Sequence, residues 1–145
     1  MKLYLSQIEQ LLNLIAKGQI KALLLYGPDK GYIDRICAAI IKKFDLLQTS
    51  IEYPNLKAQS LDMLLNSQNF FAKKELIKIR SVTATIDKTL KTILSGDFFH
   101  FAAFIGDELP SSSTIRKFFE TETNLASFLW ACQARTNPLA WLDTI

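Results

Sequence analysis

The chain has 145 residues and a formal net charge of +3, with 49% hydrophobic and 21% charged residues. This length suffices for one domain with a substantial core, and the composition excludes an intrinsically disordered chain. The positive charge is too small and too scattered to form a nucleic-acid patch by itself. No apolar run approaches the roughly 20 residues that a membrane helix needs, and the polar residues that soon follow Lys2 argue against a signal peptide. We therefore expect a cytoplasmic protein.

The first half of the chain alternates between helix-like and strand-like patterns. Ser6 and Glu9 have the spacing of a capping box, and Gly18 is a natural end for the helix that follows. The short apolar run Ala22–Tyr26 predicts a buried strand. The further elements expected in this half are an amphipathic helix beginning near Tyr32, a short strand at Thr49–Tyr53 and a helix from Ser60, as its N-cap, toward Phe71.

The second half continues the alternation. The elements expected there are a strand at Glu75–Val82, a helix from Ile86 to Gly96, a strand at Phe98–Ile105, a helix at Ser111–Glu122 and a strand at Leu125–Cys132. Parallel strands need crossover connections, which helices usually supply. The sequence therefore predicts an α/β domain with a mostly parallel five-stranded sheet and helices on both faces.

A loop between the first apolar strand and the next helix resembles a phosphate-binding loop that has lost its working residues. The loop consists of Gly27, Pro28, Asp29, Lys30 and Gly31. A P-loop follows the pattern G-x-x-x-x-G-K-[ST], whose lysine contacts the phosphates and whose hydroxyl binds Mg²⁺. Counting from Gly27, Ile33 stands in the lysine position and Asp34 in the hydroxyl position. We therefore expect no ATP hydrolysis and no bound cofactor, while weak phosphate binding by the loop amides is compatible with these residues.

The acidic residues of a P-loop ATPase are also missing from their usual place. Such an enzyme needs acidic side chains for metal binding after a central strand, where this chain has Arg80 and Ser81. Asp107 and Glu108 follow the next apolar strand instead. A polar turn before Pro110 is favoured over a displaced metal site at that position.

No other set of residues indicates catalysis or metal binding. Cys37 and Cys132 lie far apart among apolar neighbours, so buried thiols in a reducing compartment are favoured over a disulfide or a metal site. His100 lies between two phenylalanines, so we expect a structural histidine and not a general base. The serines at 111–113 have the composition of a helix cap, and no nucleophile elbow surrounds them.

Two neighbouring aromatic residues do not fit the core pattern. The inward face of the helix after Ser60 is formed by Leu61, Leu64 and Leu65. Phe70 and Met63 fall outside this stripe, and Phe70-Phe71 stands among polar residues at the expected helix end. Exposed aromatic pairs of this kind serve as anchors in a partner's pocket. A place for Phe71 in the core is the structural alternative.

Three segments, taken in order and spacing, resemble the N-terminal domain of the delta subunit of the bacterial DNA polymerase III clamp loader. The segments are Leu24–Gly31, Asn69–Lys74 with the strand Leu76–Ile79, and Gly106–Pro110 followed by Ile115–Phe119. Each motif is weak alone, and the resemblance covers nearly the whole chain up to about Phe128. It implies a RecA-like domain of the AAA+ clamp-loader class with a degenerate Walker A loop, which takes part in DNA replication within the polymerase III holoenzyme.

The resemblance also implies a partner and a site. Delta subunits bind the sliding clamp (the beta subunit) and help to open it, because two hydrophobic residues at a helix tip enter a pocket on the ring. This pair aligns with Phe70 and Phe71, although the family tends to have an aliphatic residue in place of Phe70. The implied clamp-binding set is Phe70, Phe71, Leu65 and Met63. DNA contact would be indirect, through the assembled loader and scattered lysines.

The end of the chain departs from the family. We expect residues 1–132 to form the RecA-like domain and residues 133–145 to be a tail unlike the family, with the lid and collar domains absent. Without a collar, the chain should join the other clamp-loader subunits weakly. Arg116 does not stand in the Ser-Arg-Cys motif that carries the arginine finger of the catalytic loader subunits. We therefore expect it on a solvated helix face.

Two rival interpretations lead to different expectations. A small P-loop-type ATPase or nucleotide-dependent switch would be stabilised by ATP. A truncated fragment without activity would fold poorly or bind no clamp.

Overall fold

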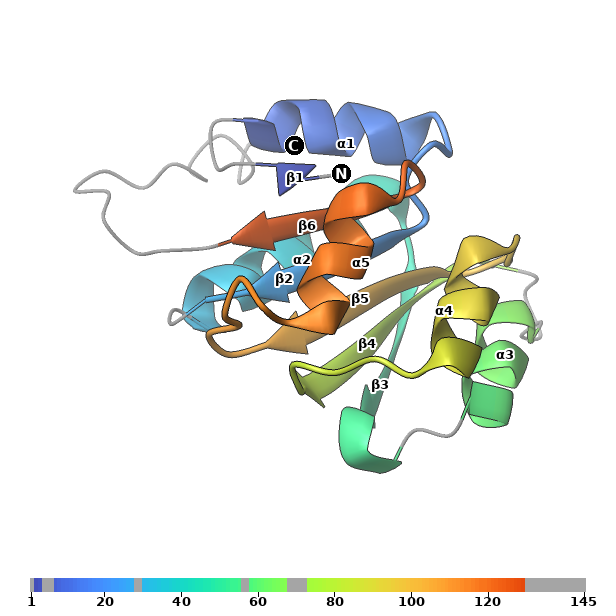
Figure 1. Cartoon of the computed structure of the whole chain (residues 1–145). Helices are drawn as coiled ribbons and strands as arrows, with labels where there is room; N and C mark the ends of the chain where they lie inside the picture. The colour runs from blue at the N-terminus through green and yellow to red at the C-terminus, as the bar shows by residue number, and fades with distance from the viewer. Residues whose placement is uncertain (1, 4–6, 28–29, 56–57, 68–72, 130–145) are drawn as a thin grey trace.

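The computed structural model describes residues 2–3, 7–27, 30–55, 58–67 and 73–129. Six strands of this part form one sheet (Figure 1), in the order β1-β6-β2-β5-β4-β3, and all their pairings are parallel. The strands are β1 (Lys2–Leu3), β2 (Ala22–Tyr26), β3 (Leu47–Glu52), β4 (Glu75–Val82), β5 (Phe101–Gly106) and β6 (Leu125–Leu129). The prediction of an α/β domain is confirmed, but the sheet has one strand more than expected. β1 was missed because two residues are too few to show a periodic pattern.

Five α-helices connect the strands in the described part of the chain. They are α1 (Ile8–Ala16), α2 (Lys30–Phe44), α3 (Ala58–Asn66), α4 (Lys88–Ser95) and α5 (Thr114–Thr121), and a short 3-10 turn, η2, covers Tyr53–Asn55. The capping-box residue Ser6 lies outside the described residues, and the predicted N-cap Ser60 is wrong because α3 begins at Ala58. Ser113 does cap a helix, since its side chain accepts a hydrogen bond from the N–H of Arg116 at 3.3 Å.

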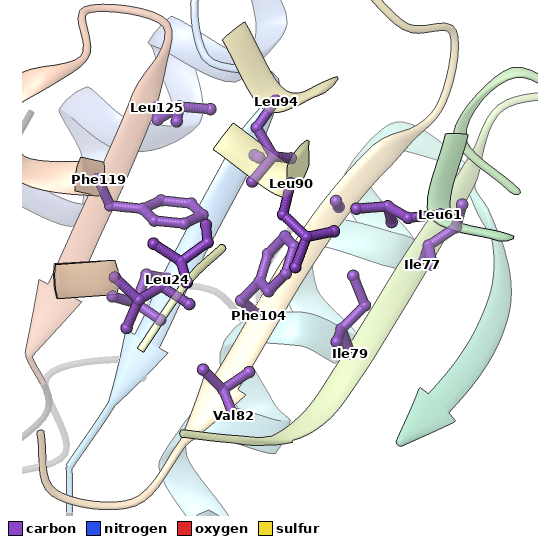
Figure 2. Packing of buried hydrophobic residues seen from close by; sticks show 14 of the residues in the cluster. Leu24, Leu61, Ile77, Ile79, Val82, Leu90, Leu94, Phe104, Phe119 and Leu125 are labelled. Atoms are coloured by element: carbon purple, nitrogen blue, oxygen red, sulfur yellow. The ribbon is translucent and has the colours of Figure 1, made fainter. Parts of the chain in front are cut away.

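The two faces of the sheet are covered by different helices. Alternate residues of a strand point to opposite faces, so Leu23 and Leu25 of β2 pack with α1 and α2, whereas Leu24 packs with α3, α4 and α5. Figure 2 shows the second of these cores, where Phe104 and Phe119 meet edge to face with ring centroids 5.4 Å apart. Helices therefore lie on both faces, as predicted.

The faces of the sheet on which the helices lie indicate where the connecting loops can form a site. α2 follows β2 on one face of the sheet and α5 follows β5 on the other, although β2 and β5 are neighbours. In such sheets, ligands bind outside the carboxyl ends of the strands at the point where the connections diverge. Within the residue ranges given above, no helix is long and apolar enough to cross a membrane.

Candidate functional site

The degenerate phosphate loop begins at this divergence point. The backbone N–H of Gly27 donates to the carbonyl oxygen of Asp107 at 3.0 Å, which joins the loop after β2 to the loop after β5. Gly27 has a φ of 140°, a region that only glycine adopts without strain. Pro28 and Asp29 lie outside the described residues, and α2 begins at Lys30. A helix therefore begins shortly after Gly27, at Lys30, as expected for a relic of a P-loop.

The residues that follow the loop do not face a phosphate site. Ile33, in the lysine position of the motif, is fully buried in the core under α2. Asp34, in the hydroxyl position, is about half exposed and lies 3.9 Å from the guanidinium of Arg80. Gly31 is exposed and Tyr32 is half buried, with the guanidinium of Arg35 5.9 Å from its ring centroid. No side chain among these described positions supplies a phosphate-binding cation in the place that the motif requires.

The end of β4 also lacks an acidic pair. Ser81 has a φ of 60°, and the register between β4 and β5 shifts between Ile79 and Val82. This left-handed residue makes a bulge at the point where an ATPase would present its acids. Asp107 and Glu108 are exposed beyond β5, in agreement with the predicted polar turn. Among the residues that the structure describes, no three His, Cys, Asp or Glu side chains are placed to hold a metal ion.

Arg116 does not lie on a solvated helix face, so that expectation is wrong. Its side chain is only 15% exposed, and its Cζ atom is 5.2 Å from the ring centroid of Tyr26. Nη1 donates to the carbonyl oxygen of Leu109 at 3.1 Å and Nε donates to Glu120 at 2.8 Å. The hydrogen bond with Glu120 raises the pKa of Arg116. This residue therefore connects α5 to the end of β2.

The helix α3 carries two residues of the proposed clamp-binding set, Met63 and Leu65, and it ends beside the amino end of β5. α3 ends at Asn66, earlier than predicted, and Phe70 and Phe71 lie outside the described residues. Met63 is 73% exposed, whereas Leu65 is fully buried against the sheet. Leu65 is therefore no surface residue, and a contribution of this residue to clamp binding is restricted to seating α3 on the core. The exposed side chain of Met63 is compatible with a surface contact.

A buried histidine joins the two chain segments that border this region. His100 has a fully buried side chain, and its Nδ1 accepts a hydrogen bond from the backbone N–H of Glu75 at 2.9 Å. Since Nδ1 accepts, the ring proton is on Nε2, which donates to the carbonyl oxygen of Ser67. The prediction that His100 is structural agrees with this environment. The residues next to His100 in the sequence do not indicate that its side chain links Ser67 to Glu75.

A cavity of about 540 Å³ lies beside His100. Apolar side chains from α1, the end of α2 and the start of β5 line most of it, together with Lys21 and Lys73. Lys21 pairs with Asp97, and Lys73 pairs with Asp45 at 2.9 Å. The lining also includes Asp45, Lys74 and His100. Lys21, Asp45, Lys73 and His100 already have ion-pair or hydrogen-bond partners within the fold.

Cys37 is a buried free thiol on α2, as predicted, while Cys132 lies outside the described residues. Burial raises the pKa of Cys37 to about 11. A thiol in this state is protonated at neutral pH and is a poor nucleophile. It therefore packs as a small apolar residue and does not form part of a reactive site.

A comparison of sequences relates the chain to a known protein. The chain is 59% identical over 126 residues to the probable DNA polymerase III subunit delta of Rickettsia prowazekii strain Madrid E, a match that covers 87% of the chain. The chain is thus similar to a probable DNA polymerase III delta subunit. It spans only 39% of that protein's length. No protein-family model matches the chain. The resemblance inferred from the sequence motifs is thus confirmed.

Proposed function

We propose that this delta-subunit relative is a non-catalytic clamp-loader domain that binds the sliding clamp during DNA replication. The observation that carries the proposal is the 59% identity to a probable delta subunit. The parallel sheet with helices on both faces supports the RecA-like interpretation. Burial of Ile33 in place of the motif lysine supports a loop that does not use ATP.

The proposed clamp contact is the segment after α3. Phe70 and Phe71 are its anchors, and the exposed Met63 adds apolar surface on α3. Aromatic anchors dominate interface energies because they bury a large area at a small entropic cost. Contacts with the other loader subunits and with DNA belong to the assembled loader in this proposal.

The test is the affinity of the purified chain for its cognate sliding clamp, measured for the wild type and for Phe70→Ala/Phe71→Ala. Loss of two anchors should cost at least about 2 kcal/mol each. Phe118→Ala, a half-buried aromatic on α5, is the matched control and should retain binding. Equal binding by the wild type and the double variant would move the contact elsewhere, and no binding by the wild type would contradict the proposal.

A further inference from the structure

We propose that the cavity beside His100 binds an amphiphilic monocarboxylate, a small molecule with an apolar body and one carboxylate group. All strand pairings are parallel, so β2, β3, β4 and β5 begin at one edge of the sheet, its amino edge. The cavity lies at this edge, because residues that precede each of these four strands line it. The site is therefore separate from the degenerate loop, which follows the carboxyl end of β2.

The cavity has the size and the lining of a pocket for a small molecule. Its volume of about 540 Å³ falls in the range of about 300–1,000 Å³ that is typical of ligand pockets. Ile20, Phe98 and Phe101 contribute buried side chains to the lining, whereas Phe99, which also lines it, is 37% exposed. An apolar group in the cavity would remove the ring of Phe99 from water, and this burial favours binding.

His100 adds a ring to the lining but no available polar atom. Its Nδ1 accepts a hydrogen bond from the N–H of Glu75, and its Nε2 donates to the carbonyl oxygen of Ser67. The rings of Phe99 and His100 meet edge to face, with their centroids 4.9 Å apart. Since both imidazole nitrogens are already bonded, this part of the lining favours a ligand with an apolar body.

The charged groups around the cavity favour an anion. Among the described residues that line it, Lys21, Lys73 and Lys74 supply three ammonium groups, whereas Asp45 supplies one carboxylate. Two of the lysines bind a carboxylate in this structure, Lys21 that of Asp97 and Lys73 that of Asp45. The hydrogen bond from Lys21 lowers the pKa of Asp97, so this ammonium group favours a carboxylate in its charged form.

The two aspartates can be displaced by a ligand. Their side chains are 98% and 88% exposed, in Asp97 and Asp45 respectively. Ion pairs at such exposed positions contribute little to stability, because water screens them and two side chains lose freedom. A ligand carboxylate arrives with an apolar body that the aspartates lack, and burial of this body favours the exchange.

The test is binding of a series of fatty acids, from hexanoate to decanoate, to the purified chain below their micelle concentrations, measured by isothermal titration calorimetry. The affinity should rise up to about fourfold with each added methylene, because each one is buried in the cavity. Decanol and decyltrimethylammonium have the same chain length without the negative charge. They should bind at least about tenfold more weakly than decanoate, because they cannot accept charge-assisted hydrogen bonds from the lysines as a carboxylate does.

Variants test whether decanoate occupies this cavity. Lys21→Met keeps an apolar side chain but removes the ammonium group, and should weaken decanoate binding by about tenfold. Lys88→Met, at an exposed position of α4 outside the lining, is the matched control and should bind like the wild type. Ala16→Trp places a large ring at an exposed position of the lining and should also weaken binding, because it fills part of the cavity.

Four results would overturn the inference. They are the absence of saturable decanoate binding, equal affinities for decanol and decanoate, equal affinities of Lys21→Met and Lys88→Met for decanoate, and binding of an acidic peptide in preference to decanoate. None of these results bears on clamp binding, which is measured separately on the same chain, so the proposed function stands or fails independently of this site.

Discussion

The guanidinium of Arg116 lies over the ring of Tyr26, with its Cζ atom 5.2 Å from the ring centroid. Tyr26 ends β2 next to Gly27, and Arg116 also donates to the carbonyl oxygen of Leu109, which follows β5. One side chain of α5 therefore holds together the two loops that meet at the carboxyl edge of the sheet. In this chain an arginine near the nucleotide loop has a packing role.

Arg116→Ala should lower the free energy of unfolding by about 1–3 kcal/mol, because it removes a cation–π contact and two hydrogen bonds of a mostly buried guanidinium. Urea denaturation measures this loss. Lys117→Ala, at the exposed neighbouring position, should change stability by less than about 0.5 kcal/mol. Equal stabilities of the two variants would contradict this role of Arg116 and would support the solvated helix face that the sequence predicts.

Mg-ATP should leave the melting temperature of the chain unchanged. The motif lysine is replaced by Ile33, which is buried in the core and cannot reach a phosphate. A ligand at a hundred times its dissociation constant would add about 2.7 kcal/mol of stability, which thermal unfolding detects easily. Inorganic phosphate, measured in parallel, reports on the loop amides alone. A shift with Mg-ATP that phosphate does not reproduce would favour the nucleotide-dependent switch.

Leu65→Ala and Met63→Ala should affect different properties, although both residues lie on α3. Leu65 is fully buried, so its truncation should cost about 2–5 kcal/mol of stability. Met63 is 73% exposed, and its truncation should change stability by less than about 0.5 kcal/mol while weakening clamp binding. Urea denaturation and clamp affinity are measured on the same preparations. Unchanged clamp affinity of Met63→Ala would remove this residue from the interface.

The stability of the chain should decrease above pH 9.0 in a manner that depends on Cys37. Burial raises the pKa of the folded thiol from 9.0 to about 11, so in this window the unfolded chain releases a proton that the folded chain retains. Rising pH therefore favours unfolding between these two values, and the contribution is constant below pH 9.0. Urea denaturation across the window measures the slope.

The variant Cys37→Ala isolates this contribution, because it keeps every other titrating group, including Tyr53, whose pKa burial also raises. Its stability should fall less steeply than that of the wild type over the same range. Identical slopes would mean that the Cys37 thiol does not titrate differently in the two states.

Local sequence was sufficient for most of the secondary structure. The apolar run Ala22–Tyr26 and the strand Glu75–Val82 have the predicted bounds, since short buried strands between turn residues are recognisable without any tertiary information. α3 was placed too late at both ends. Near its end, the carbonyl oxygen of Leu65 accepts hydrogen bonds from the N–H groups of Phe99 and His100, which are distant in sequence.

The sequence by itself determined the α/β class, the residue in the motif-lysine position and the relation to delta subunits, because these depend on residue type, order and spacing. Tertiary structure decided what Arg116, Leu65 and His100 do. Each of these side chains contacts residues that are distant in the sequence. Arg116 packs on Tyr26, Leu65 is buried in the core beneath α3, and His100 forms hydrogen bonds with Ser67 and Glu75. Periodicity reports only which face of an element is apolar, and such long-range pairings follow from how the helices dock on the sheet.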